Sequence, residues 1–334
     1  MRLLVTFAAA LVAAVSVLAA DPPPPRPQLL APGTWLLPGT FPEGRLPDGN
    51  TVLFEGATGL VVMDTGRHAW HAQAILDFAR SHDRRITDIV NSHWHLDHVS
   101  GNAPIRAAYP QAQVHTGLAM ERMIREVWPD ARERSEASIA AGRIPAAMVP
   151  DVRGDIVTRE QPEALRPDFP VTRTETRRLD GVELASHFAP HAATETDVWL
   201  YAPASRIVAA GDLVTLPVPF LDTACVQGWH DALAQVEATP FVTLVPGHGA
   251  PMDRAQFGIY RKAFAAYTAC AASSAPNARC AARWLEATAE LRAPEPADDG
   301  RAREMAEEYV DLLRANDGNG ARCLEPASRG GTRR

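Results

Sequence analysis

The run HWHLDH at residues 93–98 places three histidines and an aspartate within six positions of a chain that has only 11 histidines. The hydrophobic stretch ITDIVNS precedes it and predicts a buried strand. In an extended segment His93 and His95 project to the same side, because side chains alternate. Asp97 and His98 come where the chain begins to turn and can point to a second position. Zinc, iron and manganese accept these side chains as ligands, so the run predicts a metal site rather than a chance cluster on a solvated loop.

Four candidate ligands in one loop cannot close two metal sites, so further ligands must come from elsewhere. In TLVPGHGAP, His248 follows a predicted strand and has a glycine on either side. In RIVAAGDLV, Asp212 ends another predicted strand. The stretch SHFAPHAATETDVWLY offers both His187 and His191. His187 falls inside the strand pattern and His191 in the turn, where ligands can converge, so we favour His191 and keep His187 as its alternative.

Short β-rich segments alternate with helical ones along the chain, in the order strands, helix, strands, helix, twice over. Two β-rich halves with helices outside predict an α/β fold, a four-layer αββα sandwich. His68, His71 and His82 follow a helical spacing and are expected on the solvated side of that helix. The expected organisation is a main domain at 34–260 with an inserted helical cap at 117–173, a helical C-terminal extension at 261–315 and a disordered tail at 316–334.

The N-terminus predicts export. Arg2 precedes an apolar stretch that ends in small residues, so residues 1–20 match a secretory signal peptide, with a membrane anchor as the alternative. A proline-rich leader at 21–33 follows. The mature protein is expected to be periplasmic or secreted, without stable membrane insertion once the signal is cleaved.

Four cysteines fit an oxidising compartment. Cys270 and Cys280 lie in two helical patterns joined by a turn, which predicts a disulfide across a helical hairpin. Two unpaired thiols are the alternative. A pairing of Cys225 with Cys323 stays open. The formal net charge of −7 argues against a nucleic-acid partner, so a small-molecule substrate is expected.

The HWHLDH run, the histidine turn before DVWLYAPASRIVAAGDLV and the VPGHG loop together resemble the metallo-β-lactamase superfamily of hydrolases, from about residue 34 to 260. The resemblance implies two divalent metal ions per chain, most often zinc, with iron or manganese as alternatives. It assigns the first metal to His93, His95 and His191, and the second to Asp97, His98 and His248. Asp212 matches an aspartate that bridges the two ions in glyoxalase II-like branches. Asp64, in VVMDTG, matches a buried acidic residue that supports the metal loop.

This resemblance implies an exported hydrolase that attacks an ester, thioester, lactone or lactam carbonyl with a hydroxide held between the metals, Asp97 being the catalytic residue that orients it. The bridging aspartate favours the glyoxalase II-like and sulfur-oxidation-associated exported hydrolases. A β-lactamase, an iron-dependent oxidoreductase and a non-enzymatic binding protein are the alternatives. The chain departs from the family pattern in reading HAATET where many members have HTxG, and in the long segment at 117–173.

Overall fold

The computed structural model describes residues 22–292 and 299–323. The predicted signal peptide and the last residues of the predicted tail lie outside these ranges. Within the described part of the chain, no helix combines the length and apolar character needed to cross a membrane.

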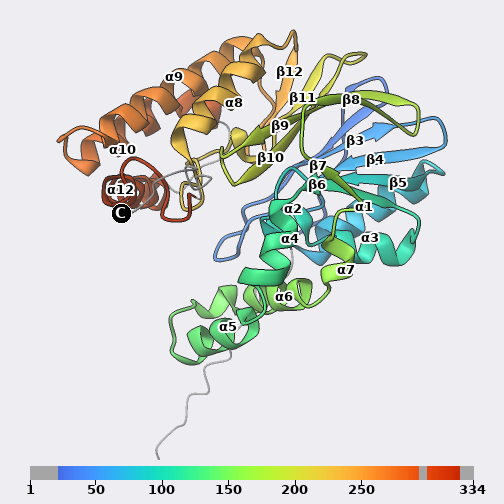
Figure 1. The fold of residues 1–334 in the computed structure, drawn as a ribbon, viewed down its shortest axis with the longest axis horizontal. Coiled ribbons are helices and arrows are strands. Elements are labelled where there is room, and N and C mark those ends of the chain that lie inside the picture. Colours follow the sequence, from blue (N-terminus) through green and yellow to red (C-terminus); the bar gives the residue numbers. More distant parts are fainter. Residues whose placement is uncertain (1–21, 293–298, 324–334) are drawn as a thin grey trace, which may run out of the picture.

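Two β-sheets form the middle of the molecule, and helices cover their outer faces (Figure 1). The larger sheet runs in chain order: β1 (Gln28–Ala31), β2 (Thr34–Leu37), β3 (Thr51–Glu55), β4 (Gly59–Met63), β5 (Arg85–Val90), β6 (Gln113–Gly117) and β7 (Phe169–Val171). The smaller sheet has the order β12 (Thr243–Val245), β11 (Ile207–Ala209), β10 (Thr196–Ala202), β9 (Val182–Pro190) and β8 (Glu175–Leu179). Strands β4 to β7 are parallel to one another, and β11 is parallel to β12.

Alternating apolar side chains explain the four layers. In β4, Val61 packs between the two sheets, while its neighbour Leu60 packs outward. In β11, Ile207 packs between the sheets and Val208 packs outward. Because both faces of these strands are buried, each sheet needs a helical layer on its outer side. The predicted αββα sandwich is confirmed.

The outer helices follow from this arrangement. The larger sheet is covered by α1 (Ala69–Ser81) and α3 (Asn102–Ala108). The smaller sheet is covered by α8 (Val226–Ala238) and α9 (Arg254–Ala271). The helices α10 (Asn277–Ala287), α11 (Ala289–Arg292) and α12 (Asp299–Ala315) extend the same hydrophobic cluster, and α10 and α12 pack beside α9. The insertion contains α4 (Ala119–Arg122), the π-helix η1 (Met123–Val127), α5 (Ala131–Ala140), the short 3₁₀-helix η2 (Ala146–Met148), α6 (Val149–Arg159) and α7 (Pro162–Leu165).

Element boundaries differ from the sequence-based expectations at three places. Strand β1 lies inside the expected leader, because the proline run stops at Pro27 and the next residues form a hairpin with β2. Strand β7 lies inside the expected cap and joins the larger sheet. Helix α9 runs as one continuous helix across the expected domain boundary at residue 260, and its capping box at Asp253 and Gln256 marks where it begins.

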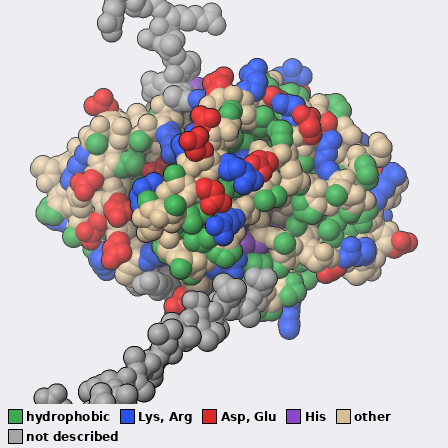
Figure 2. All heavy atoms as spheres, turned by 90° about the horizontal axis from the view of Figure 1, so that it is seen from below, with side chains coloured by type: hydrophobic (Ala, Val, Ile, Leu, Met, Phe, Trp, Pro, Cys, Tyr) green, Lys and Arg blue, Asp and Glu red, His purple; other side chains and the backbone are tan. Residues whose placement is uncertain are grey.

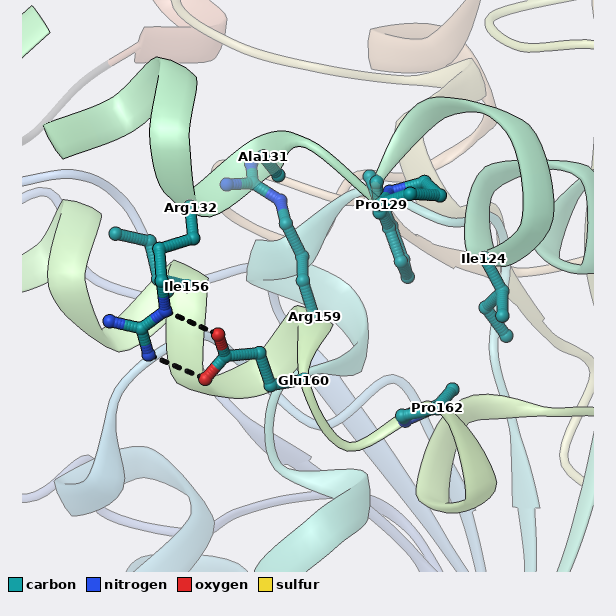
Figure 3. A pocket seen from close by; sticks show the side chains of 9 residues that line it. Ile124, Pro129, Ala131, Arg132, Ile156, Arg159, Glu160 and Pro162 are labelled. Atoms are coloured by element: carbon teal, nitrogen blue, oxygen red, sulfur yellow. Dashed lines mark hydrogen bonds and ion pairs between the residues drawn. The ribbon is translucent and has the colours of Figure 1, made fainter. Parts of the chain in front are cut away.

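A small pocket lies within the insertion (Figure 3). Its volume is about 120 Å³, and Ile156, Pro162 and the Arg159 side chain line it. At its edge Arg132 and Glu160 form an ion pair, with Nη2 2.6 Å from Oε2. None of the predicted metal ligands lines this pocket.

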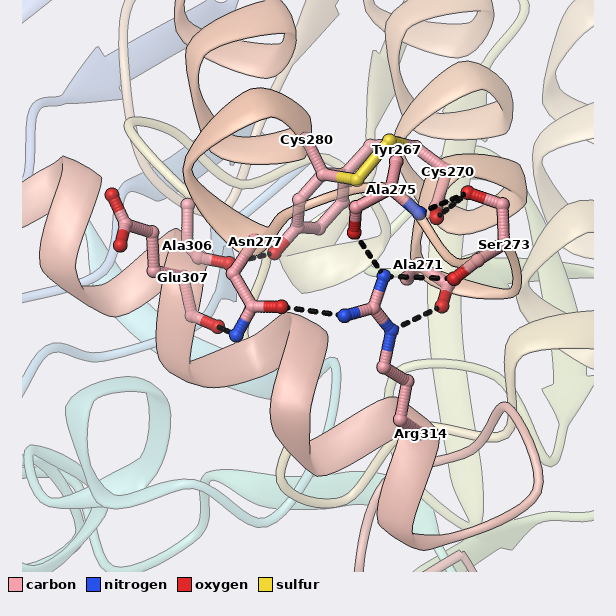
Figure 4. Close-up of a disulfide and its surroundings, with 10 residues drawn as sticks. All are labelled: Tyr267, Cys270, Ala271, Ser273, Ala275, Asn277, Cys280, Ala306, Glu307 and Arg314. Atoms are coloured by element: carbon pink, nitrogen blue, oxygen red, sulfur yellow. Dashed lines mark hydrogen bonds between the residues drawn. A yellow bond between two sulfur atoms is a disulfide. The ribbon is translucent and has the colours of Figure 1, made fainter.

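Two disulfides fix the C-terminal helices. The predicted hairpin bridge, Cys270–Cys280, joins α9 to α10 (Figure 4). Arg314 stabilises the turn between these helices, since its guanidinium donates to the carbonyl oxygens of Ala271, at 3.0 Å, and Ser273, at 2.8 Å.

The second disulfide, Cys225–Cys323, is here called the tail bridge. It holds the segment 316–323 against the start of α8, where Gly320 donates its backbone N–H to Ala224 and the Asn319 side chain accepts from Val226. The expectation of a disordered tail is therefore wrong for this segment.

Candidate metal centre

The site lies where parallel strands of both sheets end. Strand β4 leads to Asp64, and β5 leads to His93. In the smaller sheet, β11 leads to Asp212 and β12 leads to His248. Parallel strands that end at one edge bring distant parts of the chain together, and this edge of an α/β sheet is where ligands commonly bind.

The structure brings five of the predicted ligands into two overlapping triads. One triad is His93, His98 and Asp212, and the other is Asp97, His98 and His248. In each, the candidate ligand atoms lie within 4.8 Å of one another, and all five residues are buried. Nε2 of His98 lies 3.2 Å from Oδ1 of Asp212 and 3.3 Å from Nε2 of His248. His98 therefore stands at the junction of the two triads, next to Asp212.

Asp64 fixes the orientation of this junction. Its Oδ2 lies 2.8 Å from Nδ1 of His98 and accepts from the Ser92 hydroxyl at 2.7 Å, while its Oδ1 accepts from the Ser92 backbone N–H at 2.7 Å. A carboxylate only accepts, so Nδ1 of His98 carries the proton and Nε2 faces the other ligands. The role of Asp64 as support for the metal loop agrees with these contacts.

His95 lies beside this group but outside both triads. Its ring centroid is 4.4 Å from that of His93, and its Nε2 is 3.5 Å from the Thr223 hydroxyl. The same hydroxyl donates to the Ala193 carbonyl at 2.8 Å, so the turn that contains His191 adjoins His95. His191 has a φ of 51°, and its Nδ1 is buried without a hydrogen-bond partner.

The alternative ligand His187 has a different environment. It lies on β9 and stacks on Trp199, with ring centroids 3.6 Å apart. Burial lowers the pKa of His187 to about 4. A neutral ring packed flat on an indole is explained by packing alone, so the geometry favours His191 of the two.

Two glycines allow the ligands to approach the backbone. A Cβ atom at Gly247 would stand 2.0 Å from Oδ1 of Asp212, and one at Gly49 would stand 2.5 Å from Cε1 of His98. Neither distance is tolerable for a larger residue, so these glycines are required by the packing around the ligands.

The ionisation of the carboxylates and of His93 suits metal binding. Burial opposes the charge on Asp97 and Asp212, but the imidazoles of His98 and His248 outweigh it and hold the pKa of both carboxyls below the ordinary value. Burial lowers the pKa of His93, and its neighbours His95 and His98 lower it further. Ionised carboxylates and a neutral His93 ring are the states that bind metals. Burial opposes a charge on His98, but Asp212, Asp64 and Asp97 outweigh it and raise the pKa of this ring, so a metal ion would have to displace a proton from His98.

Unpartnered atoms in the site fit a bound cation. Nε2 of His93 is buried without a hydrogen-bond partner, although such atoms are almost always satisfied in folded proteins. Oδ1 of Asp212 is approached by Nε2 of His98 at 3.2 Å but accepts no hydrogen bond. Imidazole nitrogens with carboxylate oxygens form a mixed donor set that suits zinc, iron or manganese. The residues therefore fit the expected metal ions.

Sequence patterns did not identify the charged residues that connect the metal ligands to the insertion. The Arg67 guanidinium lies between Asp97 and Asp155 of α6, and His68 lies 2.8 Å from Asp48 through its Nδ1. His68 and His71 were expected in solvent, but both are buried, because acceptors such as Asp48 approach from the neighbouring loop. An Arg-His pair directly after DTG could have signalled a role near the metal loop.

Aromatic rings flank the ligands. Phe41 lies 5.1 Å from the His248 ring and is 51% exposed, and Phe220 lies 5.1 Å from the His95 ring. The Trp94 indole donates to Glu195 at 2.9 Å, and Glu195 also forms an ion pair with Arg122 of α4. Figure 2 shows one face of the molecule, on which cationic and anionic side chains are interspersed and a histidine is visible in a recess.

Comparisons with known proteins identify the family and agree with the fold. The family model described as the metallo-beta-lactamase superfamily matches residues 44–248. A metallo-beta-lactamase family protein from Thermus thermophilus has a TM-score of 0.59 at 18% identity, covering 86% of this chain and 95% of its own. The sec-alkylsulfatase Pisa1 from Pseudomonas sp. has a TM-score of 0.55 at 18% identity, covering 88% of this chain and 51% of its own. The DIM-1 metallo-beta-lactamase has a TM-score of 0.53 at 14% identity, covering 72% of this chain and 96% of its own. A search of curated proteins found no match.

Proposed function

The chain belongs to the metallo-beta-lactamase superfamily, and on that premise we propose that it is an exported, metal-dependent hydrolase of small molecules that carry an ester, thioester, lactone or lactam carbonyl. The observation that carries this proposal is the pair of buried triads that share His98. The overlapping triads bring His93, Asp97, Asp212 and His248 together around His98, and a cluster of this size fits a dinuclear centre whose two ions would share Asp212. The ligand set favours zinc.

The proposed ligands divide between two ions. His93, His95 and His191 would hold the first, and Asp97, His98 and His248 the second, with Asp212 shared between them. When bound, the pair of cations would acidify a water molecule and polarise the carbonyl of the substrate.

The side chains of the protein have defined tasks in this reaction. Asp64 keeps the proton of His98 on Nδ1, which leaves Nε2 free to serve as a ligand. Asp97 is ionised, and its Oδ2 lies 3.0 Å from Nε2 of His248, so it can orient the attacking water and accept its proton. Phe41 and Phe220 would pack against an apolar part of the substrate beside the ligands.

The disulfides support the proposed export. Both bridges require an oxidising compartment to persist, as the periplasm or the extracellular space provides. Cleavage of the predicted signal peptide near Asp21 would release the protein, which intact-mass measurement of the exported form can check.

Turnover on a substrate panel with parallel metal analysis tests the function. Purified mature protein should contain about two zinc ions per chain and hydrolyse at least one of a chromogenic lactam, a thioester or a lactone. A secondary alkyl sulfate belongs on the panel because one similar structure is a sec-alkylsulfatase. Hydrolysis of the lactam alone would identify a β-lactamase, and tightly held iron with oxygen uptake would identify an oxidoreductase. A protein that binds no metal in metal-replete buffer would refute the proposal.

A further inference from the structure

The guanidinium of Arg67 lies between a proposed metal ligand and the insertion. Its Nη2 is 3.5 Å from Oδ1 of Asp97, and its Nη1 forms an ion pair with Oδ1 of Asp155. Its Nε donates to the Pro47 carbonyl at 3.1 Å. The side chain is only 12% exposed, so all three of its nitrogens are committed in a nearly solvent-free environment.

The two oxygens of Asp97 face different partners. Oδ2 points to the metal centre, 3.0 Å from Nε2 of His248, and Oδ1 points to Arg67. An ion pair at one oxygen restricts the rotation of a carboxylate, so the contact with Arg67 favours the orientation in which Oδ2 faces the metal centre.

Helix α6 of the insertion carries two acidic residues, one turn apart, that bind arginines of two different loops of the main domain, the loop between β2 and β3 and the loop between β4 and α1. Asp155 binds Arg67, and Asp151 binds Arg45, whose Nε lies 2.9 Å from Oδ1 and 3.0 Å from Oδ2. Asp151 also accepts from the Leu46 backbone N–H at 2.9 Å. Both ion pairs attach the insertion to the main domain, but only the pair with Arg67 reaches a proposed ligand. This difference provides a matched control.

We infer that Arg67 is a positioning residue for Asp97 and that Asp155, from the insertion, holds Arg67 in place. The inference rests on the proposed function, because it assigns a partner to one ligand of that centre. The Arg67–Asp155 pair carries no net charge, so its contribution to the site is geometric. The Arg67–Asp155 pair is not needed merely to attach the insertion, because a buried ion pair seldom stabilises a fold more than an apolar contact would.

The test compares Arg67→Lys with Arg45→Lys. Lysine keeps the charge, but its single ammonium cannot replace a planar fork that reaches Asp155, Asp97 and a carbonyl at once. Zinc affinity of the metal-free protein is measured by chelator competition, with no substrate present. Arg67→Lys should weaken the second zinc site roughly 10- to 100-fold and leave the first unchanged, as loss of a contact to a metal ligand usually does. Arg45→Lys should keep wild-type affinity for both ions.

Several results would overturn the inference. Wild-type affinity of Arg67→Lys for the second ion would do so, and so would an equal loss in Arg45→Lys, which would show that attachment of the insertion is what matters. If circular dichroism shows Arg67→Lys unfolded, the charge-balanced pair Arg67→Gln with Asp155→Asn replaces it, and wild-type affinity there has the same meaning. A wild type that binds two ions but hydrolyses nothing on the panel would refute the proposed function alone, because the affinity comparison would still decide the role of Arg67. A wild type without metal would overturn both.

Discussion

Replacing Asp64 with asparagine should change the protonation of one metal ligand without changing its position. In Asp64→Asn, Oδ1 can still accept from the Ser92 N–H, but an NH₂ group takes the place of Oδ2. That group would face Nδ1 of His98 at 2.8 Å, so two donors would oppose each other in a buried site. His98 must then either leave its Nδ1 proton unsatisfied or move the proton to Nε2.

Both outcomes weaken metal binding. A buried unsatisfied donor costs about 1–3 kcal/mol. A proton on Nε2 must be displaced before that atom can act as a ligand. At about 1.4 kcal/mol per tenfold, the expected loss of zinc affinity is roughly 5- to 150-fold. The metal-free variant should also be less stable by about 1.5–3 kcal/mol, because a charge-assisted hydrogen bond is lost.

Chelator competition measures the affinity, and urea unfolding of the metal-free protein measures the stability. Asp88→Asn is the matched control, because Asp88 is another buried carboxylate on a histidine, with Oδ1 2.9 Å from Nε2 of His115, but it lies away from the metal centre. Asp88→Asn should lose stability and keep zinc affinity. Wild-type affinity in Asp64→Asn, or an equal loss in Asp88→Asn, would refute the reasoning about the His98 proton.

Three further outcomes follow from the same structure. His191→Ala should lower the zinc content from about two ions to about one, and His187→Ala should leave it at two; the opposite result would move the third ligand of the first metal to His187. Alanine variants of the tail bridge should lose about 5 kcal/mol of the free energy of unfolding and those of the hairpin bridge about 3 kcal/mol, because the bridges span 98 and 10 residues. Urea unfolding without reductant measures both losses, and a larger loss for the hairpin bridge would contradict the prediction. Burial opposes ionisation of Asp48, but the hydrogen bond with His68 and the charge of His71 hold its pKa at about 2. This depressed pKa contributes about 2 kcal/mol of stability, which is present above pH 4 and is lost between about pH 4 and pH 2. Asp48→Asn should therefore remove that part of the acid sensitivity, as measured by urea titrations of the metal-free protein at different pH values.

The proposed ligands could be predicted from sequence because each one lies within its own local pattern. His93 follows a hydrophobic strand, and so does His248. The strand pattern also separated His187 from His191, since a residue inside a strand packs on its neighbours and a residue in the turn does not have to. The sandwich could be predicted because apolar residues alternate or run continuously through the strands, and both patterns need cover on both sides.

The contacts that surround the ligands could not be predicted in this way, because they join residues whose local sequences contain no sign of each other. Arg67 and Asp155 are 88 positions apart, in a chain with 33 basic and 40 acidic residues, so nothing in either neighbourhood selects the partner. The tail shows the same limit, because its glycines and polar residues are typical of disorder. The segment up to Cys323 is ordered by the tail bridge, which starts 98 residues earlier, and by hydrogen bonds to the residues around Cys225. Chemistry placed at strand ends can therefore be predicted from short patterns, whereas the geometry that tunes it depends on contacts that only the folded chain defines. Arg67 belongs to the second kind, which is why its effect on Asp97 has to be measured through metal affinity.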